Sequence, residues 1–499
     1  MNIKRAKEEI INTVKAYLSC DESGNYKISP IRQRPILLMG PPGIGKTQIM
    51  EQVAEECKIA LVAYTITHHT RQSAVGLPFI EKKQYGGKNF SVTDYSMSEI
   101  IASVYEKQEK TGLTQGILFI DEINCVSETL APTMLQFLQY KTFGNQKVPA
   151  GWIIIAAGNP PEYNKSVREF DAVTLDRVRK IEIEPDFEVF KEYAYKQVVH
   201  PSILQYLDIR RENFYRFETT PDGTFFATAR GWEDLSEMLV VCEELPIPVD
   251  AEFIYEYIQH DRIAKDFANY YELYNKYKKD YKIEEIVLGN YSENLIGSLK
   301  IAPFDERLNL TGLLLGRLGR SFVEAENIEK YTESLYESLK SYLEQLPSSE
   351  TRPDLLLKQM IEKEEAELLH KKQEGLINRK EENAKRKSLA ALKKYQDALR
   401  TEAENPSMAS DTIKRFFGEE KESRKREIEK TSLELDNAFL FMERAFGEGQ
   451  EMVIFVTELS VNYYSAKFIS EHGCKKYYEY NKNLLFDERQ EEIIRDMEM

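Results

Sequence analysis

The chain contains few cysteines and histidines for its length. Its 499 residues include five cysteines and six histidines. No Cys-x-x-Cys pair or Cys/His cluster occurs among the cysteines, which stand at Cys20, Cys57, Cys125, Cys242 and Cys474. This spacing argues against a structural zinc site and against a disulfide framework, and it is typical of proteins kept in a reducing compartment. We therefore expect a cytoplasmic protein.

Long hydrophobic runs are also missing from the sequence. No segment approaches the roughly 20 apolar residues that a membrane-spanning helix needs. Near the start, Leu18-Ser19-Cys20 faintly resembles the end of a lipoprotein signal, but Glu8 and Glu9 interrupt the apolar stretch that such a signal requires. The apolar residues there recur at helical spacing instead, so we expect an amphipathic helix.

Positive charge is in deficit. The chain has 67 Lys and Arg against 83 Asp and Glu, a net charge of −16, and its pI is about 5.2. Such a field repels nucleic acids and anionic membranes, although a local basic site stays possible. Apolar residues make up 42% of the chain, which suffices for packed cores, and the length predicts two to four domains in a soluble, helix-rich protein.

The most informative stretch is Gly40-Pro41-Pro42-Gly43-Ile44-Gly45-Lys46-Thr47, which has the G-x-x-x-x-G-K-[ST] pattern of a phosphate-binding loop. The apolar run Pro35–Met39 before it is typical of a buried parallel strand. The apolar residues after it fall on one face at helical spacing. Strand, glycine loop and helix are the context that this motif requires, so the sequence predicts a binding site for a nucleoside triphosphate.

Each part of this motif has a chemical reason. Glycines let the backbone bring its N–H groups close to phosphate oxygens, and the helix N-terminus adds unpaired donors. Lys46 would reach the β and γ phosphates as a point charge, and the Thr47 hydroxyl would ligate Mg²⁺.

A second apolar run ends in two carboxylates. Gly116–Ile120 leads into Asp121 and Glu122, as in a buried strand that delivers acidic groups at its carboxyl end, where ligands bind in open α/β sheets. Asp121 would belong to the Mg²⁺ shell, and Glu122 would polarise the attacking water as a general base. Alone this pattern is weak, but it gains weight from the phosphate loop upstream.

The strand expected at Trp152–Ala157 ends in Gly158-Asn159-Pro160. Asn159 stands where a group sensing the γ-phosphate would be useful; the alternative interpretation is an Asx turn before proline. Two shorter patterns complete the region: a β-hairpin around Gln84–Lys88, and a strand-like run at 181–183.

These residues together resemble an AAA+ ATPase. The resemblance is carried by Gly40–Thr47, Leu118–Glu122, Asn159, Leu175-Asp176-Arg177 and Ala229-Arg230-Gly231-Trp232, which occur in the family's order and approximate spacing. The hairpin and the Gly-Asn-Pro sequence look most like the MoxR-type, AAA_5-like branch. The resemblance covers about residues 1–275. It implies a P-loop parallel sheet of the ASCE class flanked by helices, a helical lid, ATP as the nucleotide, Mg²⁺, and a homo-oligomeric ring that is usually a hexamer.

Three residue roles follow from the resemblance. Asn159 resembles the sensor-1 residue, Arg177 the arginine finger, and Arg230 the sensor-2 arginine on the lid. The family usually has Phe where Val178 stands, and Arg179 lies close by, so the choice between Arg177 and Arg179 stays open. MoxR-type ATPases are often paired with von Willebrand factor A domain proteins, and the resemblance implies such a partner.

We expect three domains: an α/β nucleotide-binding domain at 1–185, a helical lid at 186–278, and a mostly helical C-terminal region at 279–499. The last contains a charged helical hairpin at about 353–435. Within it, residues 371–394 carry nine Lys and Arg against three Glu. A solvated helix face is the simpler interpretation of that basic stretch, and contact with nucleic acid or an acidic partner is the alternative.

The leading functional hypothesis is a ring ATPase that remodels or activates a partner protein in a chaperone-like way. One alternative is a nucleic-acid motor or restriction-type NTPase subunit, against which the acidic composition argues. Another is a nucleotide-gated scaffold, which would not need a carboxylate such as Glu122 at the attacking water. Neither a membrane nor a nucleic acid is expected as a partner.

Overall fold

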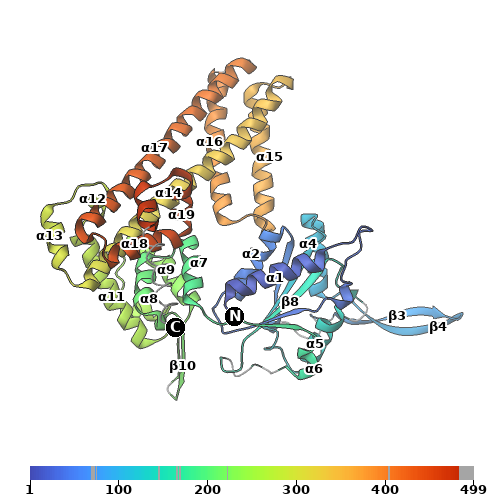
Figure 1. The fold of residues 1–499 in the computed structure, drawn as a ribbon. Helices are drawn as coiled ribbons and strands as arrows, with labels where there is room; N and C mark the ends of the chain where they lie inside the picture. Colours follow the sequence, from blue (N-terminus) through green and yellow to red (C-terminus); the bar gives the residue numbers. More distant parts are fainter. Residues whose placement is uncertain are drawn as a thin grey trace. The chain divides into compact units, whose positions relative to one another are not determined.

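The computed structural model describes residues 1–68, 74, 76–143, 146–163, 167, 170–221, 223–402 and 405–482. The chain divides into two compact units, which we describe separately (Figure 1). The first unit comprises Met1–Phe190 and Glu212–Asp234, and the second comprises Lys191–Arg211 and the residues from Leu235 onward. The three-domain division expected above remains a prediction.

A five-stranded parallel sheet forms the centre of the first unit, with the strand order β2-β5-β8-β1-β9. The strands are β1 (Ile36–Met39), β2 (Ala60–Thr65), β5 (Gly116–Asp121), β8 (Trp152–Gly158) and β9 (Arg179–Glu182). The strand after the phosphate loop lies at one edge, and β1 lies between β8 and β9. The expected α/β architecture with a P-loop parallel sheet is therefore confirmed.

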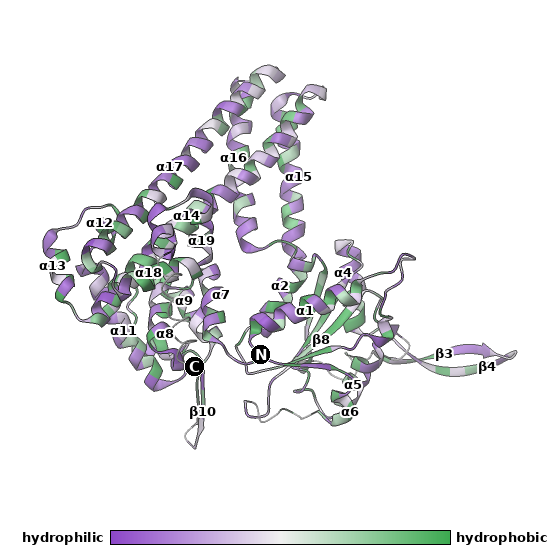
Figure 2. Cartoon of the chain, viewed as in Figure 1, coloured by the Kyte–Doolittle hydropathy of each residue, from purple (hydrophilic) through white to green (hydrophobic). Residues whose placement is uncertain are grey.

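Alternating residues of these strands supply two separate cores. Leu37, Leu118 and Ile154 belong to the core on one face, which α4 and α5 help to build. Leu38, Phe119 and Ile155 belong to the core on the other face, with α1 and α2. Because both faces are covered, the inner strands β5, β8 and β1 are apolar at nearly every position, and β8 is green in Figure 2, whereas the edge strand β9 is mostly charged.

Helices and short strands complete this unit. Helix α1 begins after Asn2, whose side chain accepts a hydrogen bond from the Arg5 N–H at 2.9 Å, and it buries Ala6, Ile10 and Val14 as an amphipathic helix should. The remaining elements of the region are η1 (Pro30–Arg32), α2 (Lys46–Cys57), η2 (Ile66–His68), α4 (Glu99–Thr111), α5 (Ala131–Tyr140), β6 (Thr142–Phe143), β7 (Gln146–Lys147) and α6 (Ala172–Leu175).

The expected hairpin is formed by β3 (Pro78–Tyr85) and β4 (Lys88–Tyr95), which pair antiparallel from Pro78↔Tyr95 to Tyr85↔Lys88. It projects away from the central sheet (Figure 1). Both faces are accessible to solvent, with Ile80 77% exposed and Phe90 49% exposed.

A second hairpin, β10 (Arg216–Thr220) and β11 (Gly223–Ala227), follows η3 (Arg211–Asn213). It belongs to the first unit although helices of the second unit flank it in sequence. Trp232, fully buried, donates its indole N–H to the carbonyl of Phe214 at 3.1 Å and so joins the start of α9 to this segment.

The second unit is helical. Its elements include the ends of α7 (Phe187–Gln197) and α9 (Ala229–Glu244), together with α8 (Pro201–Ile209), α10 (Ala251–Tyr255), α11 (Asp261–Asp280), α12 (Ile283–Val287), α13 (Glu293–Ile301), α14 (Phe304–Gln345), η4 (Leu346–Ser348), α15 (Pro353–Gln373), α16 (Arg379–Glu402), α17 (Pro406–Phe446), α18 (Gln450–Val461) and α19 (Tyr463–His472).

Four of these helices pack into an elongated bundle, which we call the arm: α15, α16, the second half of α14 and the first half of α17. Helix α14 has 42 residues, so it is roughly 60 Å long. Leu339, Leu357, Leu392 and Ile413 bring one buried side chain from each helix into a shared apolar core. The arm thus contains part of α14 in addition to the helices expected within 353–435.

Among the described helices, none is both long enough and apolar enough to cross a membrane.

Candidate functional site

The phosphate loop connects the end of β1 to the first turn of α2 and takes up backbone conformations that suit glycine. Gly43 has φ +72° and Gly45 has φ +90°, both in the left-handed region. At Gly43 a Cβ atom would lie 3.0 Å from the Thr228 side chain, so the close approach of that segment also requires glycine. The geometry explains why two of the motif's glycines are needed here.

Lys46 is buried, with 8% of its surface exposed, and its ammonium group has three acceptors. Nζ donates to the carbonyls of Gly40 at 2.8 Å and Pro41 at 2.9 Å, and to Oδ1 of Asn159 at 2.8 Å. Burial is the largest influence on its pKa, which falls to about 8; nearby Asp121 and Glu122 oppose this fall, and Arg230 adds to it. A cation with weakened solvation is well suited to bind phosphate oxygens.

Thr47 and Asp121 lie side by side at the carboxyl ends of the strands. The Thr47 hydroxyl donates to Oδ2 of Asp121 at 2.9 Å. A hydroxyl and a carboxylate are hard oxygen ligands of the kind that Mg²⁺ prefers, so the pair fits the expected metal.

Glu122 follows Asp121 in a left-handed conformation, with φ +56°. Its N–H donates to Oδ1 of Asp121 at 2.9 Å, which fixes the turn just after the strand. Its carboxylate accepts a hydrogen bond from the Thr67 hydroxyl at 3.1 Å, and Thr67 lies just past the end of β2. A non-glycine residue in this conformation is uncommon and is found disproportionately at functional sites.

Asn159 follows the last residue of β8 and forms hydrogen bonds through both its side chain and its backbone. The side-chain oxygen accepts from Lys46, as described above. Its backbone is bound by the carboxamide of Asn124, which is 2% exposed. Asn124 Nδ2 donates to the Asn159 carbonyl at 2.7 Å, and the Asn159 N–H donates to Asn124 Oδ1 at 3.3 Å.

Arg230 also lies close to the phosphate loop. Its N–H donates to the Gly43 carbonyl at 3.2 Å, and its charge is near enough to lower the pKa of Lys46. From the same segment, the Tyr215 hydroxyl donates to the Pro42 carbonyl at 2.7 Å. Burial raises the pKa of Tyr215, so this hydroxyl stays a donor at neutral pH.

The two candidate finger arginines differ in their contacts. Arg177 is exposed, and its guanidinium donates to the side chain of Gln139. Arg179 starts β9 and is bound to α1: it forms an ion pair with Glu9 at 2.5 Å and donates to the Thr13 hydroxyl. The carboxylate and the hydroxyl already bind the Arg179 guanidinium.

The structure thus brings Lys46, Thr47, Asp121, Glu122, Asn159 and Arg230 together, while Arg177 lies outside their contacts. Sequence reasoning missed Asn124, Tyr215 and Thr228. Asn124 offered one signal, because it is a polar residue three positions after Asp121 in the same motif. Tyr215 and Thr228 offered none of their own, because neither stands in a recognisable motif and their contacts with the loop form only in the folded chain.

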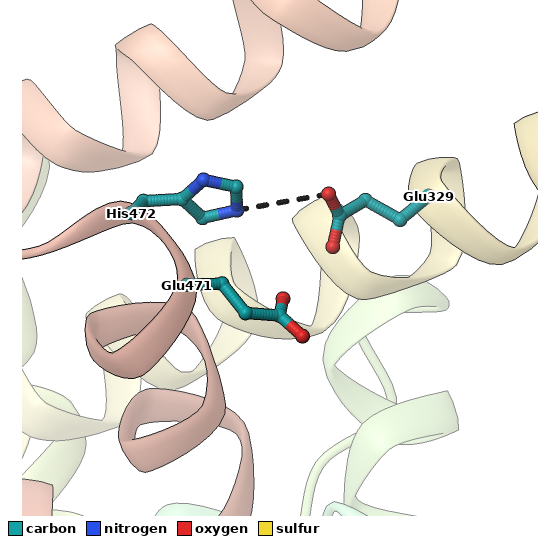
Figure 3. Close-up of side chains that lie close together, drawn as sticks. All are labelled: Glu329, Glu471 and His472. Atoms are coloured by element: carbon teal, nitrogen blue, oxygen red, sulfur yellow. Dashed lines mark ion pairs between the residues drawn. The ribbon is translucent and has the colours of Figure 1, made fainter.

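A different cluster, in the second unit, has the composition of a metal site. Potential ligand atoms of Glu329, Glu471 and His472 lie within 4.8 Å of one another (Figure 3). Arg424, however, already donates to Glu329 at 2.5 Å, and His472 Nε2 lies 3.6 Å from the same carboxylate. These contacts make the cluster part of an ion-pair network, and we assign no metal to it.

Comparison with known proteins adds one finding. Residues 36–180 match the family model described as ATPase family associated with various cellular activities (AAA). No curated protein matches the chain. The matched region runs from β1 into β9, so it contains Lys46, Thr47, Asp121, Glu122 and Asn159, but not Arg230. This match supports an ATPase of the AAA+ type.

Proposed function

We propose that the protein is a MoxR-type AAA+ ATPase that couples Mg²⁺-dependent ATP hydrolysis to remodelling or activation of a partner protein. The observation that carries this proposal is the convergence of a glycine-rich loop, two acidic residues and Asn159 at the carboxyl edge of one parallel sheet, with Arg230 of α9 beside the loop. That edge is where open α/β sheets bind ligands.

In this proposal each side chain has one task. Lys46 leaves its present acceptors to bind the β and γ phosphates, and the loop N–H groups hold the remaining phosphate oxygens. Thr47 and Asp121 would hold Mg²⁺, which would supply positive charge to the phosphate oxygens. The Glu122 carboxylate gives up its hydrogen bond from Thr67 and then accepts a proton from the attacking water. Asn159 and Arg230 contact the γ-phosphate.

The experiment compares Lys46→Ala with Glu122→Gln. Lys46→Ala removes a charge that faces the phosphates, so we expect loss of nucleotide binding. Glu122→Gln keeps the size of the side chain and is a far poorer proton acceptor, so we expect ATP binding without turnover. Binding of a fluorescent ATP analogue and release of phosphate would be measured side by side. Turnover by Glu122→Gln at the wild-type rate would contradict the assignment of the base.

The Glu122→Gln variant can also identify the partner protein. Glu122→Gln should hold a partner in the ATP-bound state, so proteins that co-purify with it and not with Lys46→Ala are candidates. A von Willebrand factor A domain protein is the partner class we propose. Recovery of the same proteins with both variants would contradict nucleotide-dependent binding.

The main alternative is a nucleic-acid motor that uses the basic stretch at 371–394. Four of the nine cations in that stretch form ion pairs within the arm, Lys372–Glu382, Lys385–Glu364, Arg386–Glu382 and Lys393–Glu365, at 2.6–2.9 Å. This favours a structural role for the stretch.

A truncated arm would test the alternative directly. Residues 332–421 would be replaced by a short glycine linker. Such a linker can join α14 to α17 there, because Glu329 of α14 and Arg424 of α17 form an ion pair at 2.5 Å just below the cut. We expect basal ATPase activity to remain and partner stimulation to fall. Tight, salt-sensitive DNA or RNA binding by the intact chain that is lost on truncation would favour the nucleic-acid alternative.

A further inference from the structure

The turn that carries Glu122 makes hydrogen bonds to the end of β8 in addition to those of the β5–β8 pairing. Paired residues of β5 and β8 end at Ile120↔Ala156. Beyond that point, the Ile123 N–H donates to the Ala157 carbonyl at 2.9 Å. The turn after β5 therefore stays hydrogen-bonded to β8 past the last paired residues, close to Asn159.

Asn124 extends this attachment with its side chain. A carboxamide carries the same donor and acceptor as a peptide group. Asn124 uses both, on the carbonyl of Asn159 at 2.7 Å and on its N–H at 3.3 Å, so it replaces the next backbone rung between the two strands. Because Asn124 is 2% exposed, water cannot substitute for it.

Gly158 makes room for this rung. A Cβ atom at position 158 would lie 2.6 Å from Asn124 Oδ1 and 2.9 Å from its Cγ, distances that real Cβ atoms do not reach. The carboxamide of Asn124 can therefore occupy this position only because residue 158 is glycine. This contact is also the reason that β8 ends in glycine just before Asn159.

The rung joins two groups that the reaction needs. Glu122 stands two residues before Asn124, and Asn159 Oδ1 contacts Lys46 Nζ at 2.8 Å. We propose that Asn124 is a positioning residue that holds the general base Glu122 and the sensor Asn159 at a fixed separation across β5 and β8. This inference rests on the proposed ATPase function. It predicts that Asn124 affects the chemical step far more than nucleotide binding, since the phosphate loop does not depend on it.

Asn124→Asp is the first test. The carboxylate keeps the acceptor for the Asn159 N–H but loses the donor and places an oxygen against the Asn159 carbonyl. We expect kcat to fall by about 10²-fold, the effect of misplacing a reacting group by about 1 Å. The Kd for a fluorescent ATP analogue should change little.

A pH profile separates positioning from a general loss of structure. Burial and the facing carbonyl oxygen should raise the pKa of an aspartate at position 124. Once protonated, that aspartate again has a donor and an acceptor, so the ratio of variant to wild-type kcat should rise as the pH falls. A variant that is merely damaged would show a constant ratio or a falling one.

Gly158→Ala provides a second route to the same contact. Its new methyl group should push the Asn124 carboxamide aside and lower kcat without a matching change in Kd. In the Asn124→Ala background the methyl group has space, so adding Gly158→Ala should cost less than it does alone. Additive effects of the two changes would overturn the coupling.

Asn437→Asp serves as the matched control. Asn437 also donates to a backbone carbonyl, that of Val287 at 2.9 Å, but in the helical second unit. It should lower the melting temperature and leave kcat unchanged. Two results would contradict the positioning role while the proposed function stands, provided that wild type hydrolyses ATP. Asn124→Asp could keep the wild-type kcat, or its affinity for the ATP analogue could fall by the same factor as its kcat. A wild-type chain that binds ATP without hydrolysing it would overturn both the positioning role and the proposed function.

Discussion

Two arginines only two residues apart have different environments, and this difference determines which can act outside its own chain. Arg179 is bound to Glu9 and Thr13 of α1. Arg177 is exposed, and its guanidinium donates to the neutral side chain of Gln139. A guanidinium that already neutralises a carboxylate of its own subunit is poorly placed to bind a phosphate elsewhere.

We predict that Arg177→Ala abolishes most turnover whereas Arg179→Ala preserves it. Arginine fingers contribute about 10³–10⁵ in rate. The partly exposed Arg179–Glu9 pair contributes about 1 kcal/mol or less to folding, so its loss should lower the melting temperature slightly. Phosphate release and thermal unfolding of both variants would be measured. The reverse result, with Arg179→Ala inactive and Arg177→Ala active, would move the assignment to Arg179.

At the scale of elements, the phosphate loop is held by several parts of the first unit. Four successive carbonyls, those of Gly40, Pro41, Pro42 and Gly43, each accept a hydrogen bond. Lys46 binds the first two, and the 212–234 segment binds the other two through the Tyr215 hydroxyl and the Arg230 N–H. With these carbonyls engaged, the loop keeps a shape in which its N–H groups are available to an anion.

We predict that Tyr215→Phe weakens ATP binding by about threefold to tenfold, because a neutral hydrogen bond contributes about 0.5–1.5 kcal/mol to ordering the empty loop. The Kd for a fluorescent ATP analogue would be measured. Tyr17→Phe is a matched control, since the Tyr17 hydroxyl donates to the Arg34 carbonyl at 3.3 Å. Equal affinities for Tyr215→Phe and wild type would remove the role of this segment in ordering the loop.

In the second unit, Glu243 of α9 joins α8 to α11. It contacts His200 Nε2 at 3.2 Å and Lys278 Nζ at 2.9 Å. Burial alone would raise the pKa of Glu243, but the hydrogen bond from His200 and the charge of Lys278 outweigh it and lower this pKa to about 2. The carboxylate therefore stabilises the folded state above its ordinary pKa of 4.5, and that stabilisation is lost as the pH falls toward 2.

We predict that Glu243→Gln lowers the melting temperature at pH 7 and that the difference from wild type shrinks between pH 4.5 and pH 2. Melting curves across that range would test it. Glu237→Gln on the same helix is the control, because the side chain of Glu237 is 75% exposed and should contribute little. A difference from wild type that is independent of pH would contradict the role assigned to the carboxylate.

At the scale of the whole molecule, we predict that Arg177 acts on the ATP of a neighbouring subunit in a homo-oligomeric ring. Mixing Arg177→Ala with Lys46→Ala, each inactive alone, should restore part of the activity. Some interfaces in a mixed ring combine an intact Lys46 site with an intact Arg177. Phosphate release after mixing would be compared with that of each variant alone. Absence of recovery in rings demonstrated to be mixed would remove the trans role.

The sequence by itself determined which residues are candidates for the site. Lys46, Thr47, Asp121, Glu122 and Asn159 could be predicted as candidates because each stands in a local pattern, a glycine loop or the end of an apolar strand. Parallel strands bring such ends to one edge of a sheet whatever the rest of the chain does. Short apolar runs also predicted the inner strands of the sheet, and a glycine-containing turn between two strand-like segments predicted the β3–β4 hairpin.

Only the tertiary structure decided how those groups are supported. Arg179 meets Glu9 across 170 residues, Asn124 meets Asn159 across 35, and Tyr215 meets Pro42 across 173. The arm likewise includes half of α14, and its carboxylates Glu364 and Glu365 pair with Lys385 and Lys393 of the basic stretch. Such contacts depend on how separate elements pack, and a hydrogen bond between distant side chains leaves no periodic signal in one sequence.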